Sequence, residues 1–104
     1  MGDMESGFDL SAMVDDVKAS VSNAKEKGMK PGIIRGLDSV AEGMIDLGSI
    51  VKTPAHEKRV KADIEKLIAE LKDCCEKGDQ GLTTGKMRTL RDRVNVLKVI
   101  LARG

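Results

Sequence analysis

The segment from Gly81 to Met87 comes nearest to a phosphate-binding loop. Gly81 and Gly85 precede Lys86, and the backbone N–H groups of such a loop cradle phosphates. The match fails because the first glycine stands one residue too close, Met87 replaces the required Ser or Thr, and no strand precedes the segment. The pattern instead indicates a glycine-rich turn before a threonine-capped helix. We therefore expect no nucleotide and no other cofactor.

The only two cysteines, Cys74 and Cys75, are adjacent in the sequence. A disulfide between helical neighbours would distort the helix, and no other cysteine is present to form a disulfide framework. We expect two buried thiols at a helix interface, in a reducing cytoplasmic environment. An intermolecular disulfide and a metal site are the alternatives.

The single histidine, His56, stands beside Glu57 in the first turn of a predicted helix. It has no second histidine, cysteine or aspartate at the spacing of a metal site, which favours a surface histidine. No Ser–His–Asp or Cys–His set can be nominated either. The sequence therefore predicts no metal site and no catalytic residue, and we expect that the protein is not an enzyme.

Charge is unevenly distributed along the chain and carries the strongest functional signal. Residues 1–17 hold five acids and no base, whereas residues 83–104 hold six bases and one acid. The six bases could contact the phosphates of a nucleic acid or the acidic groups of a protein. They are Lys86, Arg88, Arg91, Arg93, Lys98 and Arg103.

The placement of these bases favours helix packing over nucleic-acid binding. Helical spacing puts Arg91 and Lys98 on one flank of an apolar stripe, and Lys86 and Arg93 on the other. Bases that straddle a seam cover apolar surface with their stems and pair across it with their heads. The chain has no Trp or Tyr, so it lacks the side chains on which single-stranded bases usually stack. A nucleic-acid-binding module that uses the basic C-terminal helix remains the alternative.

Four apolar stripes with alternating steps of three and four residues predict the elements that carry these side chains. The helices are expected over 10–27, 33–51, 54–77 and 84–102, after a flexible tail over 1–8. The β-branched residues near the C-terminus would also suit a strand, but their spacing and the lack of a partner strand favour a helix. The fold class is thus all-α, with residues 9–104 as one helical bundle domain.

Turn residues mark the ends of these helices. Thr53 and Pro54 begin the third, Gly28 and Gly78 follow the first and third, and Thr83 or Thr84 caps the fourth. Short links make successive helices antiparallel, which gives an up-down bundle or a pair of hairpins.

In the up-down arrangement the first helix lies beside the fourth. Asp15 and Asp16 then approach Lys98 and Arg103, so internal ion pairs would account for the uneven charge.

The helix over 33–51 has the widest apolar arc, and Gly36 and Gly43 share one edge of it. Because interior glycines cost helix stability, we expect them to allow close approach of another helix. Met44, Leu47 and Ile50 complete this candidate helix contact. The same stretch holds four charges, which excludes an ordinary membrane span.

The core must be built from aliphatic residues and six methionines, which pack adaptably. The bundle is therefore either closed within one chain or completed by oligomerisation. We expect a non-enzymatic domain for protein–protein interaction or self-assembly, structural or adaptor in kind, with a homo-oligomer or a helical protein as partner. The helices over 33–51 and 84–102 are the expected places of contact.

Overall fold

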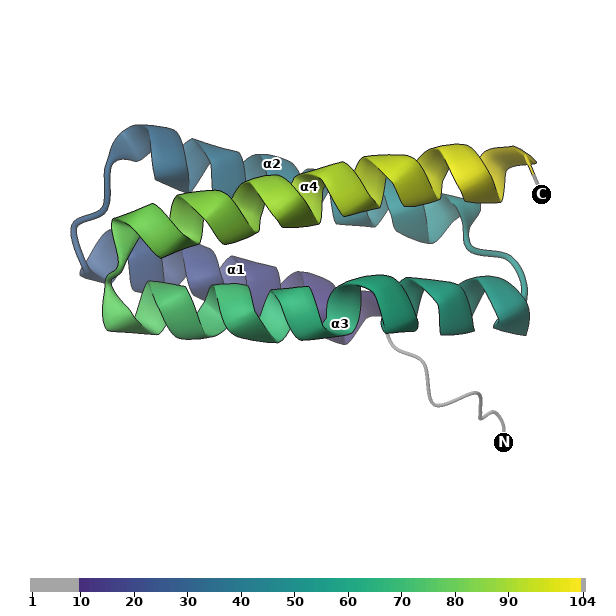
Figure 1. Ribbon diagram of the computed structural model, residues 1–104, viewed down its shortest axis with the longest axis horizontal. Coiled ribbons are helices and arrows are strands. Elements are labelled where there is room, and N and C mark those ends of the chain that lie inside the picture. Colours follow the sequence, from purple (N-terminus) through teal and green to yellow (C-terminus); the bar gives the residue numbers. More distant parts are fainter. Residues whose placement is uncertain (1–9, 104) are drawn as a thin grey trace.

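The computed structural model describes residues 10–103 and consists of four helices joined by short links. They are α1 (Leu10–Glu26), α2 (Pro31–Ile50), α3 (Pro54–Lys77) and α4 (Gln80–Arg103). Figure 1 shows them side by side, with no strand in the described part of the chain. The prediction of an all-α four-helix bundle is confirmed. The tail expected over residues 1–8 lies outside the described residues.

Each helix packs against two others, and the chain forms a pair of hairpins. α1 and α4 each contact both α2 and α3, whereas α1 and α4 lie diagonally opposite each other. In Figure 1 the α1–α2 and α3–α4 turns lie at the same end, and the α2–α3 link crosses at the other. As a result α2 and α4 run parallel.

The expectation that the first helix lies beside the fourth is therefore wrong. Short links fix the direction of successive helices, but they do not decide which helices become neighbours.

At three helix ends, the residues expected to begin or end the helix do so in the structure. The Thr53 hydroxyl accepts a hydrogen bond from the backbone N–H of His56 at 3.1 Å, and Pro54 is the first residue of α3. Gly28 and Gly78 follow α1 and α3 with φ of 70° and 74°. Glycine adopts this left-handed conformation without the steric cost of a Cβ atom, which is why both helices end there.

Two helices begin earlier than predicted. α2 begins at Pro31 rather than 33, because a proline in the first turn needs no N–H partner. α4 begins at Gln80 rather than 84, since the Asp79 carboxylate accepts from the N–H of Leu82 at 3.0 Å. Asp79 thus supplies the capping bond expected of Thr83 or Thr84, and Thr83 is buried inside the helix bundle.

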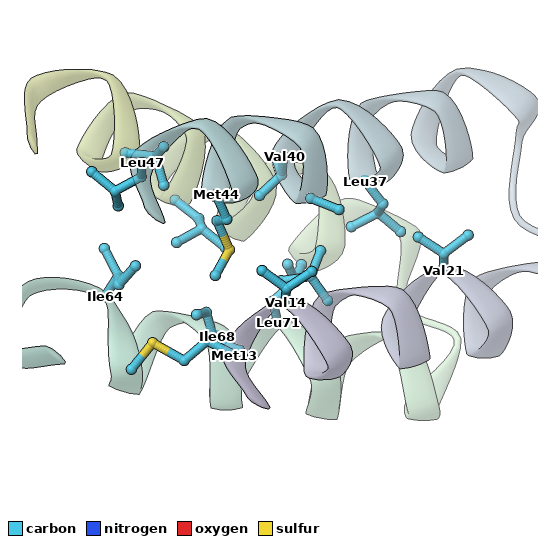
Figure 2. Packing of buried hydrophobic residues seen from close by; sticks show 14 of the residues in the cluster. Met13, Val14, Val21, Leu37, Val40, Met44, Leu47, Ile64, Ile68 and Leu71 are labelled. Carbon is cyan, nitrogen blue, oxygen red and sulfur yellow. The ribbon is translucent and has the colours of Figure 1, made fainter. Parts of the chain in front are cut away.

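The core is aliphatic, and its methionines fill part of the space between the hairpins (Figure 2). Met44 from α2 lies above Ile68 from α3 in this view, and Met13 from α1 lies beside Ile68. Leu67 continues the steps of four and three from Val60 and Ile64 but is only partly buried, whereas Ile68 is 2% exposed. The buried arc of α3 is therefore wider than the stripe, because α3 faces both α1 and α4.

Candidate functional site

The glycine edge of α2 faces α4 of the same chain. A Cβ atom on Gly36 would lie 2.6 Å from the Met87 sulfur, and one on Gly43 would lie 3.5 Å from Cγ1 of Val94. The two glycines and the two α4 residues are each seven positions apart, so the parallel helices keep one register over two turns. Both glycines therefore bring α2 and α4 together.

The other residues of the candidate helix contact also lie within the chain. Met44 and Leu47 have no exposed surface, and Ile50 is partly buried against the core. A partner would have to separate α2 from the rest of the bundle to reach Met44 or Leu47. Met44 and Leu47 are therefore inaccessible to a partner in this arrangement.

The six bases of α4 point in several directions. The Lys86 ammonium lies 3.0 Å from a carboxylate oxygen of Glu70 on α3. On the opposite flank, Arg91 and Lys98 line a groove between α2 and α4 that also contains two acids of α2, Glu42 and Asp46. The remaining three, Arg88, Arg93 and Arg103, are exposed.

The acidic start of α1 is paired with α3 rather than α4. Asp16 lies 3.4 Å from the Lys72 ammonium. The expected approach of Asp15 and Asp16 to Lys98 and Arg103 is therefore wrong, because α1 and α4 occupy opposite corners of the bundle. Asp15 instead lines a shallow groove between α1 and α2.

Both cysteines are free and buried. Cys75 is fully enclosed, and its sulfur lies 4.0 Å from the hydroxyl of buried Thr83. Burial raises the pKa of the Cys75 thiol, and a hydrogen bond from Thr83 only partly opposes this. The thiol therefore stays protonated near neutral pH, whereas nucleophilic chemistry and metal binding need the thiolate.

His56 serves the α2–α3 link. Its Nδ1 accepts a hydrogen bond from the backbone N–H of Lys52 at 3.3 Å.

Residues 81–87, the nearest match to a phosphate-binding loop, form the first two turns of α4 rather than a loop. Within residues 10–103, no three His, Cys, Asp or Glu side chains are grouped closely enough to hold a metal ion. Over the same residues, no helix has an apolar stretch of the length that a bilayer requires.

The surface that sequence reasoning missed is apolar. Within residues 10–103, the large apolar side chains that remain exposed belong to α2 and α4: Ile45, Leu82, Val96 and Val99. Val96 and Val99 lie one turn apart on α4, away from its buried residues Leu97 and Leu101. A second series of four-three-four steps, from Asp92 through Val96 and Val99 to Arg103, was the signal that could have found them.

Comparison with protein-family models, curated proteins and solved structures finds no match to this chain.

Proposed function

We propose that this chain is a non-enzymatic protein–protein interaction domain that self-associates through the outer face of α4. The observation that carries this proposal is the exposure of Val96 and Val99, at 49% and 56%. Val94, Leu97 and Leu101 of the same helix are buried on its opposite side. α4 is thus apolar on two sides, and only one of them is covered by the residues that the structure describes.

The amino-acid type at these two positions supports a contact. Valine loses side-chain freedom in a helix, so an exposed helical position gains stability from Ala, Lys or Glu instead. Nothing within the bundle requires valine there, since both side chains are about half exposed. If a second apolar surface covered both valines, their removal from water would stabilise the complex.

Three side chains that could do chemistry have structural roles instead, which supports a non-enzymatic domain. The thiol of Cys75 is enclosed, the imidazole of His56 accepts a backbone hydrogen bond, and Lys86 pairs with Glu70.

Sedimentation equilibrium of the full chain tests the proposal. We expect the average mass to rise above that of the monomer as the concentration approaches about 0.5 mM, since a small interface gives weak affinity. The double variant Val96→Gln, Val99→Gln should remain a monomer. The matched control is Ile45→Gln, which removes a similarly exposed apolar side chain from α2 and should associate like the wild type. A wild type that stays monomeric over this range overturns the proposal.

Nucleic-acid binding is the second candidate, and the exposed Arg88, Arg93 and Arg103 favour it. It predicts binding of duplex DNA or RNA whose affinity falls steeply with salt concentration, and loss of that binding in Arg88→Ala, Arg91→Ala. The absence of any mobility shift at low salt would end this candidate.

A further inference from the structure

Four exposed residues form one line along the outer face of α4. Asp92, Val96, Val99 and Arg103 follow one another in steps of four, three and four. At about 100° per residue they fall within an arc of about 60°, opposite the buried stripe of the same helix. We call this line the outer stripe. It has the spacing of a coiled-coil seam.

The order of residue types in the outer stripe makes it self-complementary. An acid stands at one end, a base stands at the other, and the two valines lie between them. If two copies of α4 lie antiparallel, each Asp92 faces the partner's Arg103 and each Val96 faces the partner's Val99. A parallel arrangement would place Asp92 against Asp92 and Arg103 against Arg103. Charge therefore selects the antiparallel direction.

From this complementarity, and resting on the proposed self-association, we infer that the partner is a second copy of this chain, docked antiparallel on α4. The contact is two-fold symmetric, so each copy supplies the same surface and the assembly closes as a dimer. Two Asp92–Arg103 pairs flank two Val96–Val99 layers.

The dimensions of α4 allow both ion pairs to form together. Asp92 and Arg103 are eleven residues apart, which is about 16 Å along a helix. Because the two-fold axis lies midway between them, the same separation on the second copy brings both ends into register. This stretch lies wholly within α4, which ends at Arg103.

The residues that flank the outer stripe fit this register. Arg93 comes over the partner's Ile100, so its aliphatic stem can cover an apolar side chain that is only partly buried. On the other flank, Asn95 comes beside the partner's Ala102. Among the other bases of α4, Lys86 pairs with Glu70, and exposed Arg88 lies one turn before Asp92, beyond the end of the outer stripe. Arg91 and Lys98 point to the groove that holds Glu42 and Asp46.

Other occupants fit the outer stripe less well. A nucleic acid would be repelled by the Asp92 carboxylate, and its phosphates would not cover Val96 and Val99. A uniformly acidic helix would pair with Arg103 but would place like charge against Asp92. A second copy satisfies both ends of the stripe.

Reversing the charge at either end tests the arrangement. Asp92→Arg alone and Arg103→Asp alone each place like charges at both pairs, so each variant should associate at least about tenfold more weakly than the wild type. Mixed in equal amounts, the two variants should form a dimer with one copy of each, because every pair again joins opposite charges. The control, Lys18→Asp, reverses a base at an exposed position on α1, the helix diagonally opposite α4, and should associate like the wild type.

Sedimentation equilibrium of the separate and mixed variants measures the association. Recovery of the dimer only in the mixture supports the antiparallel arrangement. If the wild type associates but the mixture does not recover, or if the single variants associate normally, the arrangement is wrong and the proposed self-association still stands. A monomeric wild type overturns both.

Discussion

Replacing Gly43 by alanine should stabilise the bundle by about 1 kcal/mol. Glycine in a helix interior is about 1 kcal/mol less favourable than alanine, because it loses more backbone freedom on folding. The new Cβ atom would lie 3.5 Å from Cγ1 of Val94, which is ordinary van der Waals contact. The full gain in helix propensity should therefore appear in the free energy of unfolding.

Gly36 is the matched control, one heptad earlier on the same edge of α2. A Cβ atom there would lie 2.6 Å from the sulfur of Met87 and 2.7 Å from its terminal methyl carbon. The end of this flexible side chain must move outward and lose buried area, at a cost of about 1 kcal/mol. Gly36→Ala should therefore leave stability nearly unchanged. In a Met87→Ala background the space is free, and the gain of about 1 kcal/mol should return.

Urea unfolding followed by circular dichroism measures these differences. In thermal unfolding, a change of 1 kcal/mol corresponds to a shift in Tm of about 4–8 °C for a domain of this size. If Gly43→Ala is destabilising, α4 lies closer to α2 than the structure shows. If Gly36→Ala stabilises as much as Gly43→Ala, and adds independently to Met87→Ala, the packing of Met87 over Gly36 is refuted.

Three further changes test separate parts of the fold. Asp16→Lys should lower the free energy of unfolding, measured in urea, by less than about 1 kcal/mol. Lys72→Asp should restore this loss and Lys98→Asp should not, because only Lys72 faces Asp16. Restoration by Lys98→Asp would contradict the hairpin arrangement. Gly78→Ala should lower stability by about 1 kcal/mol, because φ is 74° there, and an unchanged Tm would show that this turn adopts another conformation. Burial raises the pKa of Cys75, so the unfolded chain loses this proton first as pH rises, and stability should fall above the ordinary thiol pKa. Comparison of wild type and Cys75→Ala up to about pH 10 checks this, and parallel pH profiles would refute it.

The helices themselves could be predicted from the sequence because their apolar stripes and end signals agree. Thr53 and Pro54 fixed the start of α3, and the two glycines in the left-handed region fixed the ends of α1 and α3. The helix starts expected at 33 and 84 left Pro31 and Asp79 in the links between helices. Each can begin a helix as readily as it can form a turn, and only the observed hydrogen bonds decide between the two.

The choice of neighbouring helices could not be predicted from the stripes. Every stripe is wide enough to meet two other helices, and the charge asymmetry was equally compatible with several pairings. The contact of Met87 with Gly36 and the pairing of Asp16 with Lys72 show which arrangement the chain adopts. Both depend on side-chain shapes across helices that are far apart in sequence.

The structure buries part of the candidate helix contact of α2 within the bundle. Met44 and Leu47 were proposed because α2 has the widest apolar arc, but this width reflects its burial between α1 and α4. Exposed Val96 and Val99 were hidden by the stronger core stripe of α4, because two interleaved stripes on one helix resemble a generally apolar segment. Their exposure becomes visible only when the position of α4 in the bundle is known.

Dilution of an isotopically labelled sample, followed by amide chemical shifts, tests the central claim most directly. If two copies meet through the outer stripe, amides between Asp92 and Arg103 should shift with concentration, while those of α1 should not. The shifts should vanish in the Val96→Gln, Val99→Gln variant. Spectra that do not change from about 10 μM to about 1 mM, or shifts that gather on α1 instead, would contradict the proposal that this domain self-associates through α4.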